Sequence, residues 1–192
     1  MIMAKKYEFK PDKPRSGPLS KLFLTQTQRR ALLKWTLYGA LLVALSVIQD
    51  VLMSRVSIFG ATTELVPCAI FLICVVEGLE SGSIFALIAS LVYLFSGTGA
   101  GYYTIVFITL AAVLTTALRQ ALLQKGFVAA MVCTFLAMVG YEIFTFFIGL
   151  FLGLTTWSRL GVFTLTALLS LAAAPLLYPV ILSIGGGDTW KE

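Results

Sequence analysis

One acidic side chain lies inside a long apolar stretch of this sequence. Glu142 is near the middle of residues 127–154, where its neighbours are aromatic, aliphatic or small. An ionisable group in such a segment costs about 2.5–3.5 kcal/mol to insert into lipid, so it normally has a partner or a role. Two interpretations are open. Glu142 is either a proton, substrate or subunit-contact site, or a protonated acid hydrogen-bonded within the protein to Tyr141, Tyr93 or a threonine.

The rest of the sequence offers few groups for catalysis. The chain has no histidine, which removes the commonest general base and the usual zinc ligand. Cys68, Cys74 and Cys133 lie in apolar runs and form no CxxC pair, so buried thiols are predicted. Glu77 and Glu80 flank a predicted turn, where we expect solvated side chains. We therefore predict no enzymatic activity, no cofactor and no metal site.

The composition is that of a membrane protein. Hydrophobic residues make up 59% of the chain and charged residues only 12%, whereas about a quarter of a soluble domain is charged. The apolar character is nearly unbroken from Trp35 to Ile184. Helices are the expected spanning elements, because each satisfies its own backbone hydrogen bonds in hydrocarbon. We predict an all-α polytopic membrane bundle over residues 35–184.

Polar and glycine-rich breaks divide this region into six predicted transmembrane helices. Their ranges are Trp35–Met53, Leu65–Leu79, Ser83–Phe95, Tyr102–Leu123, Phe127–Leu154 and Val162–Ile184. The second and third are short, since fifteen residues rise about 22 Å against a hydrocarbon core of roughly 30 Å. These two helices either cross a locally thinned bilayer or form a re-entrant hairpin.

The distribution of charge predicts the orientation. Nine of the fourteen basic residues precede Trp35, where only two acidic residues occur. Residues 1–34 are also rich in proline and polar side chains, which predicts a largely disordered tail. The positive-inside rule places this tail in the cytoplasm, close to anionic lipid headgroups. Six spans then return residues 185–192 to the cytoplasm as a short second tail. We favour lipid contact over nucleic-acid binding for the basic tail.

Two pairs of small residues are candidate helix-contact sites. Ala40 and Ala44 are four residues apart in the first predicted span, and Gly149 and Gly153 are four apart in the fifth. This spacing lets two helices approach closely in lipid. We predict a partner contact or an internal contact at each pair.

Short motifs around the second and third spans resemble those of the MreD family of rod shape-determining membrane proteins. The resemblance covers about residues 49–119. The shared features are a proline at the start of a span, a Gly-Leu-x-x-Gly turn, glycines after the third span, and a glutamine near the end of the first span. The matching residues are Gln49, Pro67, Gly78, Leu79, Gly82, Ser96, Gly97 and Gly101. The family's aspartate falls at Tyr93, so no role of that acid carries over.

The resemblance implies a function without catalysis. Members of this family are scaffolds of the bacterial cell-elongation machinery, which synthesises peptidoglycan, and they lie in the cytoplasmic membrane. The resemblance implies that this chain binds an MreC-like membrane-anchored protein. It also implies a link between an MreB-like filament inside the cell and a RodA-like glycosyltransferase and penicillin-binding transpeptidase acting outside.

A second class of protein stays open. Substrate-binding subunits of energy-coupling-factor vitamin transporters are also six-span proteins with a similar fold, and Ala40-xxx-Ala44 resembles the small-residue motif by which they dock on their membrane partner. A vitamin site needs aromatic and polar groups around a cavity that opens outward. The residues that would supply it are Tyr102, Tyr103, Glu142, Trp157 and Arg159.

Overall fold

The computed structural model describes residues 26–51, 57, 59–97, 101–122 and 126–185. The predicted tail over residues 1–25 and the short tail from residue 186 lie outside the described residues. The chain divides into two units between Leu33 and Lys34. The packing described below is that of the second unit.

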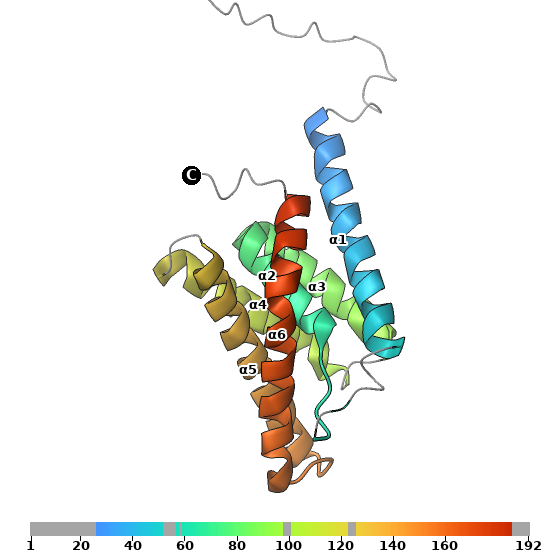
Figure 1. The fold of residues 1–192 in the computed structure, drawn as a ribbon, viewed down its shortest axis with the longest axis vertical. Helices are drawn as coiled ribbons and strands as arrows, with labels where there is room; N and C mark the ends of the chain where they lie inside the picture. The colour runs from blue at the N-terminus through green and yellow to red at the C-terminus, as the bar shows by residue number, and fades with distance from the viewer. Residues whose placement is uncertain (1–25, 52–56, 58, 98–100, 123–125, 186–192) are drawn as a thin grey trace, which may run out of the picture. The chain divides into compact units, whose positions relative to one another are not determined.

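The described residues form helices and contain no strand, as predicted. The elements are α1 (Gln26–Val51), α2 (Leu65–Glu77), α3 (Leu79–Phe95), α4 (Tyr103–Leu122), α5 (Phe127–Phe151), a 3-10 turn η3 (Trp157–Arg159) and α6 (Leu160–Gly185) (Figure 1). Helices α1, α4, α5 and α6 are long and apolar enough to cross a membrane. The chain is thus a helical, membrane-embedded protein of the multi-pass kind.

The helix bounds follow the predicted spans except at two places: α3 begins at Leu79, four residues before the predicted start at Ser83, and α1 begins earlier than predicted. Helix α1 begins at Gln26, nine residues before the predicted start at Trp35. Residues 26–34 were expected in the disordered tail, and this part of the prediction is wrong. The physical reason is helix propensity: Arg29, Arg30 and Lys34 all belong to residue types that favour the helix.

Helix α2 lies at the centre of the bundle. All twelve residues from Leu65 to Val76 are buried, and the helix packs against α3, α4, α5 and α6. A helix that is apolar on every side is expected in such a position. Its thirteen residues rise about 20 Å, less than the hydrocarbon core. Protein encloses this short helix, so its length does not have to match the bilayer.

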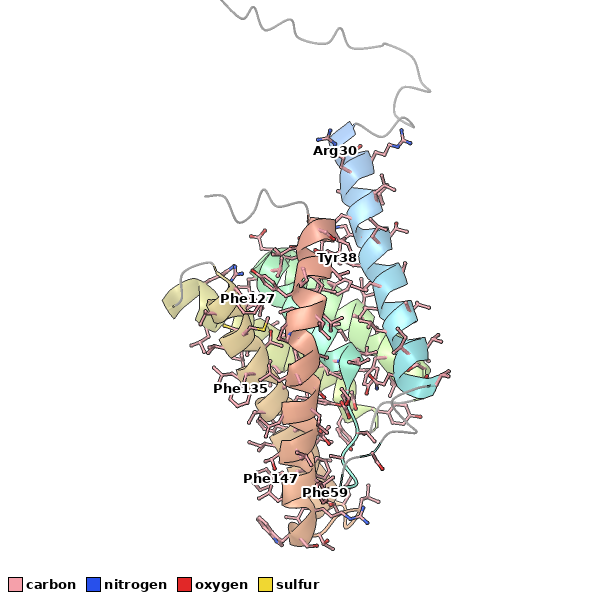
Figure 2. The ribbon with its side chains drawn as sticks, in the orientation of Figure 1. Arg30, Tyr38, Phe59, Phe127, Phe135 and Phe147 are labelled. Carbon is pink, nitrogen blue, oxygen red and sulfur yellow. The ribbon has the colours of Figure 1, made fainter. Side chains whose placement is uncertain are left out.

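An extended segment leads into α2 from one end of the bundle. Phe59 lies level with the start of α6 (Figure 2), and the chain then runs without regular structure to Glu64. The backbone N–H of Glu64 donates to Ser170 Oγ at 2.8 Å, and Ser170 is near the middle of α6. Non-helical backbone at membrane depth is tolerated where protein encloses it. The extended residues precede the predicted second span, which is helical from Leu65 to Glu77.

Two glycines allow α2 and α3 to meet closely, one between the helices and one inside α3. Gly78 alone separates the helices and has φ +95°, a conformation that favours glycine. At Gly82 an added Cβ would lie 2.9 Å from both Cα and O of Cys74. The Cys74 thiol donates to the Gly82 carbonyl at 3.0 Å, and all three cysteines are buried as predicted. The Gly-Leu-x-x-Gly motif is thus the joint that brings α2 and α3 into contact.

Candidate functional site

At the end of α2, both carboxylate oxygens of Glu77 have partners. Lys34 Nζ lies 2.5 Å from Glu77 Oε2, and the Tyr38 hydroxyl donates to Glu77 Oε1 at 2.7 Å. The Glu77 side chain is 4% exposed, so the expectation of a solvated side chain there is wrong. The early start of α1 explains the difference, because it places Lys34 and Tyr38 on one helix facing Glu77.

Contacts from four helices converge around this ion pair. The buried Tyr38 hydroxyl also lies 3.3 Å from the Ile181 carbonyl of α6. Arg119 at the end of α4 is buried and donates to the Val75 carbonyl of α2. Helices α1, α2, α4 and α6 are therefore held together by polar contacts at the Glu77 end of α2.

At the opposite end of α2, Gln49 joins three helices. Its Oε1 accepts from the Val66 N–H at 3.0 Å, and its Nε2 donates to the Tyr93 hydroxyl at 3.5 Å. The first N–H groups of a helix have no partner within the helix, so Gln49 caps α2 from α1. Positions 49 and 93, both singled out by the family resemblance, are thus in contact. Pro67 is in the first turn of α2, where a missing N–H is tolerated.

Beside this cap, two acidic residues come together. Glu142 of α5 is 3% exposed and interacts electrostatically with Glu64, the residue before α2. Tyr141 interacts with both acids and with Tyr93. The partner of Glu142 is therefore a second acid. We missed Glu64 because we assigned it to an outside loop. Glu64 directly precedes an apolar segment whose third residue is proline. This pattern could have predicted a helix start.

The two acids have unsatisfied oxygens. Glu64 Oε2 and Glu142 Oε1 are both buried and neither has a hydrogen-bond partner, so no hydrogen bond joins them to each other. Thr145, one turn after Glu142, has a buried hydroxyl beside Tyr141 that meets no hydrogen-bond criterion either. A buried polar atom without a partner costs about 1–3 kcal/mol. In the part of the chain that the structure describes, no three histidine, cysteine, aspartate or glutamate side chains gather as they would at a metal centre.

The residues expected for a vitamin site do not line one cavity. Glu142 is buried, whereas Tyr102 and Trp157 are 86% and 66% exposed. Glu142 lines a cavity of about 230 Å³ between α5 and α6. The other residues of its wall are aliphatic, aromatic or threonine and include none of the other four expected residues.

Of the two small-residue pairs, only Ala40 and Ala44 lie on an open helix face. Both are exposed, on the side of α1 opposite the buried Leu42 and Leu45. Gly153 lies beyond the end of α5 with φ +70°, and the Leu154 N–H returns to the Gly149 carbonyl at 2.8 Å. This pair ends a helix, and its contact role stays a prediction.

The two glycines after α3 have backbone conformations that side chains rarely adopt. Gly97 has φ +81° and Gly101 has φ +151°. A Cβ at Gly101 would also lie 2.7 Å from Cε1 of Tyr103. These glycines end α3 and lead into α4, so the structure gives both a local conformational role.

A groove runs between α1 and α3. It encloses about 440 Å³ and is mostly apolar. Its walls are Trp35 and Gly39 of α1 and Ser81, Ile84, Phe85 and Ile88 of α3.

Comparison of the chain with protein-family models, with curated proteins and with solved structures gives no match.

Proposed function

We propose that this chain is a non-enzymatic scaffold of the bacterial cell-elongation machinery, and that it binds the transmembrane helix of an MreC-like protein. In this proposal it lies in the cytoplasmic membrane, and MreB-like, RodA-like and penicillin-binding proteins assemble on the same complex. The observation that carries the proposal is the open face of α1. Ala40 and Ala44 are exposed there at the spacing that lets a second helix approach closely.

The position of α1 supports this role. Its buried face touches the bundle through long side chains such as Tyr38 and Gln49. Its opposite face carries exposed aliphatic residues, including Val43, Val47 and Val51, around the two alanines. Small residues flanked by larger aliphatic ones provide van der Waals contact for a partner helix in lipid, where no hydrophobic drive exists between helices.

The motif residues support the family part of the proposal. Gly78 and Gly82 form the α2–α3 joint, and Gln49 caps α2. Each of these residues has a physical reason for its type at its position. The motif residues therefore contribute to the packing of the helices, and this supports the resemblance to MreD-like proteins.

The proposed topology is six spans with both termini in the cytoplasm. Lys34 and Arg119, from different helices, both contact the Glu77 end of α2. Basic residues are in excess on the cytoplasmic side of membrane proteins. The Glu77 end of α2 is then the cytoplasmic end, and the extended segment through Glu64 enters from outside.

Co-purification tests the proposed partner. The full chain is expressed with a tagged, single-span MreC-like protein, and the amount recovered in mild detergent is measured. The double substitution Ala40→Leu with Ala44→Leu is expected to lower recovery about tenfold, which corresponds to about 1.4 kcal/mol. Ala172→Leu on an exposed face of α6 is the matched control and should leave recovery unchanged.

A cellular test separates the two open classes of protein. Depletion of the chain should round rod-shaped cells without an uptake defect. Equal recovery of the partner with the double variant would overturn the proposed interface. A purified protein that retains a stoichiometric vitamin would overturn the scaffold function in favour of a transporter subunit.

A further inference from the structure

We infer that Glu64 and Glu142 form a binding site for one small hard metal cation at the start of α2. Hard cations are those that prefer oxygen ligands, such as Na⁺ and Ca²⁺. The inference rests on the burial of this pair and on the unpartnered oxygen of each acid, and it is independent of the proposed scaffold function.

The first support is that each acid of the pair has a buried oxygen without a partner, whereas both oxygens of Glu77 are paired. Glu77, at the other end of α2, has Lys34 and Tyr38 on its two oxygens. Glu64 Oε2 and Glu142 Oε1 are equally enclosed by protein but have no donor. Ionisable groups inside membrane proteins normally pair or mark an ion pathway. A structural role alone does not explain two acids placed together with an oxygen of each unpaired.

The surroundings of the pair match a cation in charge. The charged group that acts on Glu142 is Glu64, another acid. The titratable group that interacts with both acids is Tyr141 of α5, which also interacts with Tyr93 of α3; α1 and α6 contribute the uncharged Gln49 and Ser170 nearby. The N-terminus of α2 favours a negative charge on Glu64. Two buried acids without a basic partner repel each other when both are ionised, and a bound cation would remove this repulsion.

The ligand atoms also match a hard cation. Glu64 Oε2 and Glu142 Oε1 are buried carboxylate oxygens without a hydrogen-bond partner, and the buried Thr145 hydroxyl lies one turn after Glu142, beside Tyr141. The Tyr141 hydroxyl lies beside them. Oxygen donors without nitrogen or sulfur suit alkali and alkaline-earth ions rather than zinc or copper.

The backbone at this point is a helix start enclosed by protein. Helix α2 begins at Leu65, directly after the extended residue Glu64, and helix ends enclosed within a membrane protein are places where ions bind. Access follows the same segment, because Thr62 is exposed and Thr63 and Glu64 are half-buried.

Thermal unfolding of the full chain in detergent tests the inference. Tm is measured in choline chloride and after replacement by NaCl or by CaCl₂ at equal ionic strength, at pH 8 and at pH 5. A cation that binds only the folded protein raises Tm in a saturable way, here by roughly 3 °C or more at pH 8. The rise should be smaller at pH 5, because carboxylates must lose their protons to bind a metal. The Na⁺ and Ca²⁺ arms distinguish a monovalent from a divalent site.

Three variants and one control locate the site. Glu64→Gln and Glu142→Gln should each abolish the cation-dependent rise in Tm. Thr145→Val, which keeps both carboxylates, should weaken the apparent affinity about tenfold and serves if an acid variant fails to fold. Glu80→Gln is the control, since Glu80 is exposed and distant in sequence from the pair; its rise should equal that of the wild type.

Three results would overturn the inference. The first is a wild-type Tm that neither cation raises at either pH. The second is a rise that persists undiminished in both acid variants. The third is a Tm that depends on pH but not on either metal, which would mean that the pair holds only a proton.

Discussion

The two ends of α2 each carry a glutamate, and the two glutamates are in opposite electrostatic situations. Glu77 lies where a lysine and a tyrosine from α1 occupy both its oxygens. Glu64 lies beside Glu142, and each of these acids has an oxygen with no partner. One helix thus has a satisfied acid at its end and an unsatisfied acid at its start.

The difference separates a structural contact from a candidate binding site. Burial of a charge is costly unless it is paired and hydrogen-bonded. At the Glu77 end the bundle meets this cost with its own side chains, and the contact holds α1 to α2. At the Glu64 end the cost is unmet by the described side chains. A buried acid without a partner in the protein is a better candidate for function than one that is fully paired.

The largest expected effect is at the tight joint near the Glu77 end. Gly82→Ala should lower the free energy of unfolding by about 3 kcal/mol, because the new Cβ would meet backbone atoms of Cys74 at 2.9 Å and only a helix shift relieves this. Chemical unfolding in detergent measures the change. Gly140→Ala in α5 is the control: no atom lies within 4 Å of its added Cβ, so it should be neutral or slightly stabilising. Equal stability of the two variants would contradict the close packing of α2 on α3.

The second prediction concerns the ion pair itself. Glu77→Ala should cost about 2 kcal/mol, because the buried Tyr38 hydroxyl and the half-buried Lys34 lose their acceptor. Glu77→Gln retains an acceptor for Tyr38 and should cost about 1 kcal/mol. The same unfolding assay measures both. If the alanine variant proved as stable as the wild type, the Glu77 end would not be the structural contact described here.

Most of the helices could be predicted from the sequence, and the reason is local. Apolar runs broken by Gly78, by the loop after Phe95 and by Gly126 each correspond to a helix, because burial or lipid contact requires the whole run to be apolar. The turn at Gly78 also follows from residue type, since glycine marks such turns, whereas the predicted turn residues up to Gly82 belong to α3.

The polar contacts could not be predicted, because they join residues far apart in the chain. Lys34 and Glu77 are 43 positions apart, and neither apolar periodicity nor charge pattern indicates that they meet. Glu64 follows a polar stretch that is typical of a surface loop. Its burial depends on the extended segment that enters the bundle beside Ser170, and only the three-dimensional packing reveals this.

A third prediction examines the hydrogen bonds at the Glu64 end. Gln49→Leu should lower the free energy of unfolding by about 1–2 kcal/mol, because the buried Val66 N–H then has no acceptor. Gln120→Leu, at an exposed position of α4, should change it little. Hydrogen exchange at the first turn of α2 measures the local effect and should become faster in the Gln49 variant. Unchanged exchange there would mean that Gln49 does not cap the helix.

The smallest effect, and the one that bears most directly on the comparison, is expected from Glu142→Gln. In choline chloride this substitution should leave the free energy of unfolding unchanged or raise it by up to about 1 kcal/mol. It removes one of two neighbouring buried acids without breaking any hydrogen bond of Glu142 Oε1, which has none. The new amide can also donate to Glu64, whose Oε2 has no partner.

Comparing the change in the free energy of unfolding for Glu142→Gln with that for Glu77→Gln tests whether the two acids differ. A satisfied acid loses stability on this substitution, and an unsatisfied acid does not. The two substitutions are chemically identical, and both replace a carboxyl group that protein encloses. If Glu142→Gln destabilised the protein in choline as much as Glu77→Gln does, Glu142 would have a stabilising partner within the chain and the two acids would be equivalent. If it is neutral or stabilising, the chain itself provides no stabilising partner for the Glu142 carboxyl group. The comparison of Tm in choline, Na⁺ and Ca²⁺ then distinguishes a bound cation from a bound proton.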